Sequence, residues 1–357
     1  MIERYDVIII GAGIAGAAAA FFIGQRPSRR RVLILERESM PGMHSTGRSA
    51  ALFMESYGPA QVRALTRASR PFLESPPAGF CETPLLRPRG ALFVGRADQA
   101  DAVEQLHQRL RADGCPALLM GGDTARELVG VLRPEAAEHA LLDPGAADID
   151  VDALHQGYLR GARDVGAQLI CNAPVQALNF DGTAWQVEAG DQSYRADIII
   201  NAAGAWVDEV ARMANVAPIG IEPCRRSAMV FDPPDGVDSS AWPCVIGIAE
   251  DFYFKPEAGL LLGSPANADP VSPHDVLPEE IDIAMAIDRI EAATTLRIVR
   301  PRRTWAGLRS FVASGEIVAR QDDANRSFIW AAALGGYGIQ SSPAVGALCA
   351  RSVDMVA

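Results

Sequence analysis

The chain of 357 residues is long enough for two domains with a substantial core, and its composition (49% hydrophobic, 22% charged) is that of an ordinary globular protein. Its formal net charge of -11 argues against nucleic-acid binding, which depends on clustered Lys and Arg. The six cysteines include no C-x-x-C pair and the five histidines no H-x-x-x-H pair, so the pattern favours reduced thiols over a disulfide framework or a zinc site.

Residues 7–36 predict a strand–helix–strand unit that binds a dinucleotide. An apolar strand leads into Gly11, Gly13 and Gly16 with G-x-G-x-x-G spacing, and a small-residue helix and a second apolar strand follow. Glu36 ends that second strand, where a carboxylate accepts hydrogen bonds from a ribose. A signal peptide or membrane helix is the alternative, but the glycines, the acidic residues that precede them and the second strand argue against it.

A run of small residues, STGRSAA over 45–51, comes shortly after Gly42. Two interpretations of this run are open. Either Ser45 or Thr46 caps a helix that continues from Ala50, or the small side chains let a planar isoalloxazine ring lie against the backbone. Because a nucleotide fold precedes the run, we favour contact with the ring.

The middle of the chain is predicted to be an insertion followed by a return to a parallel core. Helical spacing of apolar residues predicts helices over 60–73, over 98–112 and from about 152, the last capped by Asp150 or Asp152. Residues 81–97 and 221–265 alternate strand and turn signals. The run 198–206 (IIINAAGAW) predicts a buried strand that ends on small residues, which again lets backbone approach a cofactor.

Two arginines in the second half stand in apolar surroundings. Arg226 shares its strand face with apolar residues, so its charge is expected to point inward while Arg225 points outward. Arg309 lies among apolar and aromatic residues. For each arginine alone the alternative is a structural carboxylate partner, and Tyr253 alone would be a core tyrosine on the strand face that it shares with Lys255.

The last signal is an apolar strand over 328–334, a glycine turn and a helix predicted to begin at Ser342 or Pro343. The N-terminus of such a helix can point at an anion. A reduced flavin is anionic at N1 and C2=O, so this end of the helix can stabilise the charge that develops during reduction.

Several motifs together carry a resemblance to a known family. They are the glycine fingerprint with Glu36 and Gly42, STGRSAA, NAAGAW, YFKPEAGLLLGSPANADP, WAGLRSF and GGYGIQ. Along nearly its whole length the chain resembles the FAD-dependent D-amino-acid oxidase superfamily, in particular the bacterial D-arginine and related D-amino-acid dehydrogenases. The resemblance implies an α/β fold, with a Rossmann-like βαβ FAD-binding domain of the glutathione-reductase type and an α+β substrate domain on a mixed antiparallel sheet. It assigns 1–80, 142–215 and 305–357 to the FAD-binding domain and 81–141 and 216–304 to the substrate-binding domain.

The resemblance also implies site residues and noncovalent FAD, because no cysteine stands where relatives attach flavin covalently. The catalytic residues that it implies are Arg226, Tyr253 and Arg309, which would grip the substrate α-carboxylate, Tyr57, which would close the pocket, and Gly336 and Gln340 beside the amine and the flavin. The cofactor-binding residues that it implies are Gly11, Gly13, Ile14, Ala15, Gly16, Glu36, Arg37, Ser45, Thr46, Gly47, Arg48, Ser49, Ala50, Ala51, Val175, Ala203, Gly204, Trp206, Gly335, Gly336, Tyr337, Gly338, Ile339 and Gln340.

The activity implied is oxidative deamination of D-amino acids to 2-oxo acids and ammonia, with hydride transfer from Cα to flavin N5. Arginine-preferring members have an acidic residue where this chain has Ala91 and a histidine where it has Leu52. Because a buried cation needs a carboxylate partner to compensate its desolvation, we expect neutral or apolar side chains to be favoured over D-arginine. The alternatives are an oxidase or dehydrogenase of glycine, sarcosine or a 2-hydroxy acid, and a flavoprotein without turnover.

The remaining expectations concern partners and location. The substrate is a small amino acid and the electron acceptor a quinone or O2, and no nucleic acid and no transmembrane segment are expected. Some oxidase relatives place a lysine near N5 for oxygen, and Lys255 is the only lysine of this chain, which favours a dehydrogenase. We expect a cytoplasmic protein, free or peripheral to the inner membrane, whose chain ends at Ala357, sooner than its relatives do.

Overall fold

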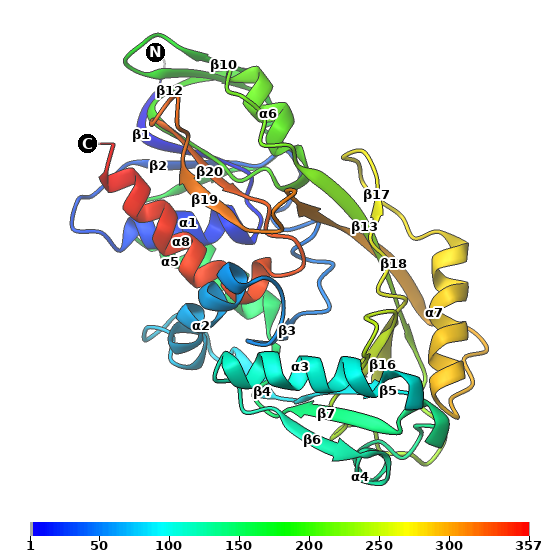
Figure 1. Ribbon diagram of the computed structural model, residues 1–357. Coiled ribbons are helices and arrows are strands. Elements are labelled where there is room, and N and C mark those ends of the chain that lie inside the picture. Colours follow the sequence, from blue (N-terminus) through cyan, green and yellow to red (C-terminus); the bar gives the residue numbers. More distant parts are fainter. Residues whose placement is uncertain (1–2, 357) are drawn as a thin grey trace.

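The first of two lobes is built on an eight-stranded sheet, as seen in the computed structural model, which describes residues 3–356 (Figure 1). Its central strands run parallel in the order β12, β1, β2, β9, and β20 lies parallel to the end of β12. The strands are β1 (Glu3–Ile10), β2 (Val32–Leu35), β9 (Gln168–Ile170), β10 (Val175–Phe180), β11 (Trp185–Ala189), β12 (Gln192–Asn201), β19 (Val318–Gln321) and β20 (Phe328–Ala332). The end of the chain at Ala357 lies outside the described residues.

Helix α1 (Ile14–Gly24), which is rich in small side chains, packs against the sheet and is contacted by α5 and α8. The helices of the lobe are α1 (Ile14–Gly24), α2 (Ala60–Glu74), α5 (Val151–Asp164), α6 (Val207–Met213) and α8 (Gly338–Asp354), with a 3-10 turn over Gly204–Trp206. A Cβ at Gly346 of α8 would lie 2.8 Å from the carbonyl oxygen of Ala18, so only glycine allows α8 to pack so close to α1. This close packing buries the α1 helix directly behind the glycine turn.

The second lobe is built on a nine-stranded sheet in which only β14 and β5 pair in parallel. Its strands are β5 (Ala91–Gly95), β6 (Leu118–Gly121), β7 (His139–Asp143), β13 (Glu222–Phe231), β14 (Cys244–Gly247), β15 (Tyr253–Glu257), β16 (Leu260–Ser264), β17 (Asp269–Pro270) and β18 (Arg303–Phe311). Its helices are α3 (Ala100–Ala112), α4 (Gly122–Leu128) and α7 (Glu280–Ala293), with 3-10 turns over Ala97–Gln99 and Pro134–Ala136. A small sheet of β3 (Leu52–Phe53), β8 (Ala147–Ile149) and β4 (Leu86–Pro88) completes the fold.

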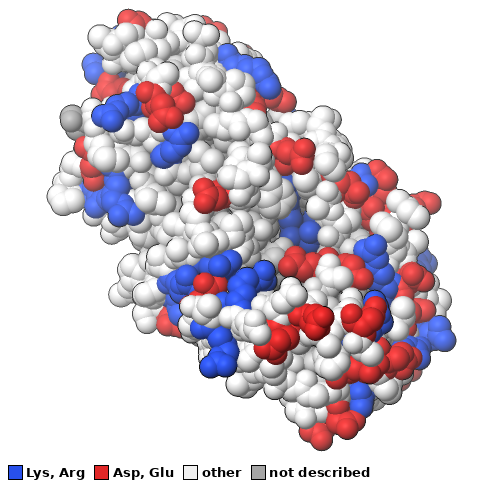
Figure 2. All heavy atoms as spheres, in the orientation of Figure 1, with Lys and Arg blue, Asp and Glu red and all other residues white. Residues whose placement is uncertain are grey.

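The surface is hollowed between the two lobes, and basic side chains gather over α2 and the neighbouring end of α3 (Figure 2). An ion pair joins the lobes at this place, since Arg63 of α2 lies 2.8 Å from Asp113 at the end of α3. The Nη1 of Arg63 also donates to the carbonyl oxygen of Gly58 at 2.6 Å. The turn that precedes α2, which carries Tyr57, is therefore fixed to both lobes.

The predicted fold class is confirmed, and most predicted elements are present within one or two residues of their expected ends. Asp150 caps α5, since its Oδ1 accepts from the N–H of Ala153 at 3.0 Å. The helix considered from Ala50 is absent, because residues 49–51 have no regular structure and Leu52–Phe53 form β3. The domain division stays a prediction, although β18, most of which was assigned to the first domain, pairs with β13 in the second sheet.

The prediction that the last helix begins at Ser342 or Pro343 is wrong, because α8 begins at Gly338. Pro343 has no N–H to donate to the carbonyl of Ile339. The hydroxyl of Ser342 donates to that carbonyl instead, at 3.0 Å, so the helix passes through the proline. None of the helices described over 3–356 has the length and apolar character needed to cross a membrane.

Candidate functional site

A cleft opens where the carboxyl ends of the parallel strands meet the second sheet, which is the usual place for a ligand in an open α/β sheet. Gly11 takes φ +101° there, and a Cβ at this position would lie 2.6 Å from the carbonyl oxygen of Ala202. A Cβ at Gly16 would lie 1.9 Å from the oxygen of Gly11. The two glycines therefore allow the tight turn and the close helix packing that the fingerprint predicts.

The backbone of the glycine turn is held by side chains from two segments further along the chain. Glu36 accepts from the N–H of Ala12 at 2.8 Å and from the N–H of Glu38 at 3.0 Å, one bond for each carboxylate oxygen. Thr46 accepts from the N–H of Ile14 at 3.0 Å. These bonds fix the end of β1 against the end of β2, while the carboxylate keeps acceptor capacity for a ligand hydroxyl.

His155 of α5, which sequence reasoning missed, also contacts the backbone of this glycine turn. Its Nε2 lies 2.8 Å from the carbonyl oxygen of Ala12, and its ring fills the space against Gly42. Burial lowers the pKa of His155, so the ring is neutral at pH 7 and its N–H donates to the carbonyl. No motif in the sequence marks this histidine.

One end of the cleft is lined by Trp206. The Cζ atom of Arg37 lies 4.8 Å from the ring centroid of Trp206. The ring centroids of His44 and Trp206 are also 4.8 Å apart. His44 also contacts Glu38 at 2.9 Å. Sequence reasoning missed His44, although it directly precedes the run of small residues.

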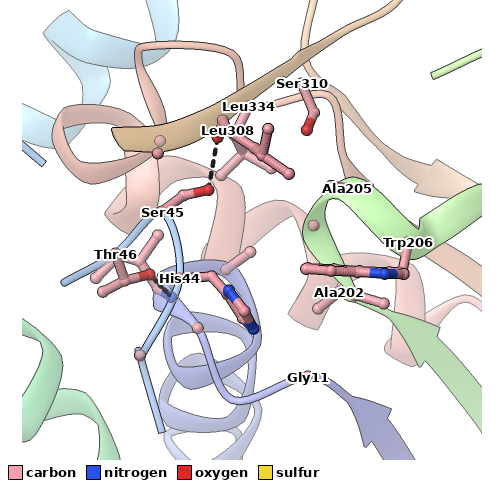
Figure 3. A pocket seen from close by; sticks show the side chains of 18 of the residues that line it. Gly11, His44, Ser45, Thr46, Ala202, Ala205, Trp206, Leu308, Ser310 and Leu334 are labelled. Atoms are coloured by element: carbon pink, nitrogen blue, oxygen red, sulfur yellow. Dashed lines mark hydrogen bonds between the residues drawn. The ribbon is translucent and has the colours of Figure 1, made fainter. Parts of the chain in front are cut away.

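The run of small residues lines one side of the cleft and is fixed to β18 (Figure 3). The hydroxyl of Ser45 donates to the carbonyl oxygen of Leu308 at 2.6 Å. Arg48 donates to the carbonyl oxygens of Met43, Val276 and Ala306 and pairs with Asp275. The run is thus an ordered loop that joins the two lobes over the cleft.

The cleft contains two arginines on the same face of two paired strands. In the antiparallel register of β13 and β18, Arg226 is opposite Gly307 and Cys224 is opposite Arg309. Since residues two apart share a face, Arg226 and Arg309 lie diagonally across the ladder and both line the cleft. Burial and the neighbouring Arg309 lower the pKa of Arg226, as expected for a guanidinium that is partly withdrawn from water beside a second positive charge.

Neither of these guanidinium groups pairs with a carboxylate within the described part of the chain. The Nε of Arg226 donates to the carbonyl oxygen of Asn267, and Nη1 of Arg309 lies 3.4 Å from the hydroxyl of Tyr57. Tyr253 adjoins Arg226 in the same cleft. Two arginines and two tyrosine hydroxyls without an anion of the protein are suited to hold the carboxylate of a ligand.

The neighbouring Arg225 is different, and the expectation that it points outward to solvent is wrong. Its side chain is buried against α7, where it pairs with Asp282 at 2.8 Å and also with Glu279. It lies on the opposite face of β13 from Arg226, as the alternation predicts, but α7 covers that face. Arg225 therefore has the structural carboxylate partner that Arg226 lacks.

The start of α8 closes the cleft near the arginines. A Cβ at Gly336 would lie 2.8 Å from Nη1 of Arg309, so the backbone approaches the guanidinium as closely as glycine allows. Gln340 lies one turn further on and is buried. Its amide accepts from the N–H of Met54 at 2.9 Å and donates to Thr66 at 3.0 Å, so its polar atoms are directed away from the cleft.

Most of the predicted site residues come together in this cleft, although their roles stay predictions. The predicted cofactor-binding residues that do not line it are Gly16, Gly47, Ala51, Tyr337 and Gln340, and the predicted catalytic residues that do not are Tyr57 and Gln340. Lys255 does not line it either, because it is buried between Asp148 at 2.8 Å and Glu257 at 2.6 Å. Within residues 3–356 no group of His, Cys, Asp and Glu could hold a metal ion.

Beside the arginines, the surroundings of Tyr57 are apolar. Leu52, Tyr57, Ile246 and Ile248 are partly buried and pack against a buried cluster that contains Met54 and Ala91. Ala91 and Leu52 are the two positions where arginine-preferring relatives are expected to have polar residues.

Comparisons with known proteins show the family and the fold of the chain. The chain matches the family described as FAD dependent oxidoreductase (DAO) over residues 6–352. It is 24% identical to the bovine (Bos taurus) FAD-dependent oxidoreductase domain-containing protein 1 over 98% of this chain and 81% of that protein, and 24% identical to glycine oxidase of Geobacillus kaustophilus over 99% and 94%. L-proline dehydrogenase of P. horikoshii has a similar fold, with a TM-score of 0.85 and 20% identity over 98% of this chain and 93% of that chain.

Proposed function

The chain belongs to the DAO family of FAD-dependent oxidoreductases, and we propose that it deaminates D-amino acids with neutral or apolar side chains to 2-oxo acids and ammonia. The cofactor of the family is FAD, and the cleft fits it. Gly13 and Gly204 both line the cleft: a Cβ at Gly204 would meet nothing within 4 Å, and a Cβ at Gly13 would meet only the hydroxyl of Thr46, at 3.3 Å. Glu36 is placed at the end of β2 for a ribose, and the cysteines of the described chain do not line the cleft, in line with noncovalent FAD.

The observation that carries the proposal is that Arg226 and Arg309 lie together in the cleft without a carboxylate partner from the described part of the chain. Holding two guanidinium groups together without an anion is unfavourable, and a bound carboxylate would relieve it through charge-assisted hydrogen bonds. Tyr57 and Tyr253 add hydroxyl donors on either side. An α-amino acid presents such a carboxylate one bond from the carbon that is oxidised.

Bound FAD supplies the acceptor for the hydride that leaves Cα. The protein contributes orientation: Arg226 and Arg309 fix the carboxylate, which limits the rotation of the substrate and directs its Cα–H into the cleft. A neutral substrate amine can expel the hydride with its own lone pair, so the chain need not supply a strong base. Tyr57, whose turn is fixed by Arg63, would cover the bound substrate.

The apolar cluster around Tyr57 supports the choice of side chain. Leu52 and Ile246 are partly exposed beside Tyr57, and a cationic side chain placed against them would lose water without gaining a carboxylate partner. An apolar side chain would gain about 25 cal/mol for each Å² that it buries there. The preference for the D-form rests on the sequence motifs shared with D-amino-acid dehydrogenases.

A second candidate is the oxidation of glycine, a secondary amine or a 2-hydroxy acid. The names of two similar proteins, glycine oxidase and L-proline dehydrogenase, favour this candidate, because such substrates share the carboxylate and need only a small side-chain space. The electron acceptor of this chain would be a quinone or O2 in either case.

The test is anaerobic reduction of the purified holoenzyme. D- and L-forms of leucine, methionine, phenylalanine and arginine, together with glycine, sarcosine, proline and lactate, are added separately, and the visible absorbance of the flavin is followed. Bleaching by neutral D-amino acids alone supports the proposal, and readmitted air then distinguishes an oxidase from a dehydrogenase. Bleaching only by glycine, sarcosine, proline or lactate contradicts it in favour of the second candidate.

A further inference from the structure

The hydrogen-bond ladder of the second sheet is interrupted beside Arg226. On one side β13 pairs with β18 along its length, but on the other side it pairs with β17 only at Cys224 and Arg225 and with β16 only from Met229 to Phe231. Between these two partners, Ser227 has no neighbouring strand on that side. Backbone groups in such a gap need other partners.

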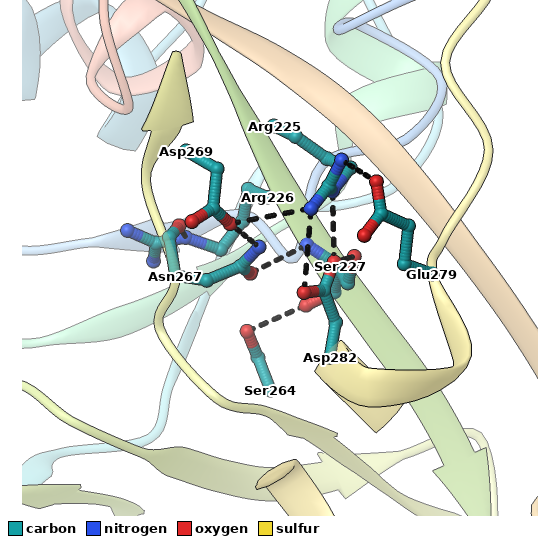
Figure 4. A network of polar contacts seen from close by, with 8 residues as sticks. All are labelled: Arg225, Arg226, Ser227, Ser264, Asn267, Asp269, Glu279 and Asp282. Atoms are coloured by element: carbon teal, nitrogen blue, oxygen red, sulfur yellow. Dashed lines mark hydrogen bonds and ion pairs between the residues drawn. The ribbon is translucent and has the colours of Figure 1, made fainter. Parts of the chain in front are cut away.

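Two side chains take the place of the missing strand (Figure 4). The N–H of Ser227 donates to Oδ1 of Asn267 at 2.9 Å, and its carbonyl oxygen accepts from the hydroxyl of Ser264 at 2.7 Å. The same hydroxyl accepts from the N–H of Ala266 at 3.1 Å, and Ala266 takes φ +52°. The chain thus leaves the sheet after Ser264 and turns sharply before it returns at Asp269.

This detour brings the main chain of Asn267 to Arg226. The Nε of Arg226 donates to the carbonyl oxygen of Asn267, which leaves both terminal nitrogens of the guanidinium for the cleft. The amide of Asn267 is fixed at both ends, since its nitrogen donates to Asp269 at 2.7 Å while its oxygen holds Ser227. A guanidinium held at Nε presents its other edge in one orientation, as a bidentate carboxylate requires.

We infer that Asn267 is a positioning residue that sets the orientation of Arg226 for the substrate carboxylate. Ser264 is the second anchor of the same detour. The inference rests on the proposed function, because it takes Arg226 as part of the carboxylate clamp. On the opposite face of β13, Asp282 binds the hydroxyl of Ser227 at 2.6 Å and also Arg225, so the strand itself is held independently of Asn267.

The variant that tests this inference is Asn267→Ala in the holoenzyme. The probe is 4-methyl-2-oxopentanoate, the 2-oxo acid of leucine, whose binding is followed by the change in flavin absorbance in air. We expect its dissociation constant to rise about tenfold, with bound FAD retained and the melting temperature within about 3 °C of the parent, because only two hydrogen bonds are lost and one of them is to the exposed Asp269. Glu279→Gln, which alters an exposed partner of Arg225 on the far face, is the control and should leave the constant unchanged.

The same measurement in an Arg226→Met background separates positioning from general damage. If Asn267 acts through Arg226, Asn267→Ala adds no further loss once Arg226 is absent. A loss that persists in that background, or an unchanged constant in the single variant, overturns the inference. If Asn267→Ala does not fold, Ser264→Ala loosens the same detour and should show a smaller loss that also disappears with Arg226→Met.

The Arg226→Met variant also distinguishes a failure of the positioning role of Asn267 from a failure of the carboxylate clamp. Weaker binding in Arg226→Met with normal binding in Asn267→Ala removes the positioning role and keeps the clamp. Unchanged binding in Arg226→Met refutes the carboxylate clamp, and the positioning role with it.

Discussion

Gly336 gives a sharp test of the carboxylate clamp because it limits where Arg309 can stand. In Gly336→Ala the new Cβ would lie 2.8 Å from Nη1 and 3.0 Å from Cζ of Arg309, whereas ordinary contacts begin near 3.4 Å. The guanidinium must therefore retreat by about 0.6 Å. The backbone of Gly336 is outside the left-handed region, so alanine adds no backbone strain, and the displaced atoms belong to the end of a flexible side chain.

The retreat should weaken substrate binding far more than it weakens the fold. The contact of Arg309 with the hydroxyl of Tyr57 is already 3.4 Å long and would break in most directions of movement. A charge-assisted hydrogen bond is worth about 1.5–3 kcal/mol, so loss of one such bond to the substrate carboxylate raises KM by roughly 10- to 150-fold. Because the clamp also orients the Cα–H of the substrate, kcat should fall as well, while bound FAD is retained.

Steady-state kinetics with D-leucine and an artificial electron acceptor measure both constants. The control is Gly121→Ala, at a position where a Cβ would meet nothing within 4 Å, and its constants should equal those of the parent. An unchanged KM in Gly336→Ala would refute the placement of Arg309 in the clamp. A fall in bound FAD together with kcat would show instead that Gly336 serves the cofactor alone.

Three further predictions follow from buried groups. Glu36→Gln removes the charge that holds the N–H of Ala12, so the dissociation constant of FAD in a fluorescence titration should rise about tenfold. Lys255→Met leaves the half-buried carboxylate of Asp148 with only Arg89, so urea unfolding should show a loss of about 3 kcal/mol. The rate at which the reduced protein reacts with O2 should stay unchanged, because Lys255 does not line the cleft. Burial lowers the pKa of His155, so as the pH falls through about 6.5 the unfolded chain takes up a proton on this residue before the folded protein does. The free energy of unfolding, measured in urea, should therefore fall between pH 7 and 5 more steeply in the parent than in His155→Gln.

The nucleotide-binding part of the fold could be predicted because its signals are local. The strand, the glycine turn and the next strand occupy one continuous stretch, and a Cβ at Gly11 or Gly16 would collide with backbone in the way that the fingerprint implies. The start of α8 could not be predicted in the same way. A proline is favoured in the first turn of a helix, so Pro343 predicts a helix that starts beside it. Only the structure reveals that the helix starts earlier and that the hydroxyl of Ser342 replaces the missing N–H.

The substrate side depends on contacts between distant segments. Alternation along β13 places Arg225 and Arg226 on opposite faces, but it does not say that α7 covers one face and the cleft the other. Alternation and spacing also say nothing about side chains whose partners come from distant parts of the chain, as is the case for His155, His44 and the amide of Gln340. Sequence reasoning therefore missed the first two and directed the third toward the substrate, away from its actual partners.

The arginine pair shows where prediction from the residues alone ends. Taken singly, Arg226 or Arg309 is best explained by a structural carboxylate, and Arg225 in fact has one. What changes the interpretation is the antiparallel register of β13 and β18, which puts both side chains on one face although 83 positions separate them in the sequence. Two like charges that share a cleft and lack an anion of their own are suited to hold a ligand that carries one, and this arrangement supports the proposed carboxylate clamp more strongly than either residue does alone.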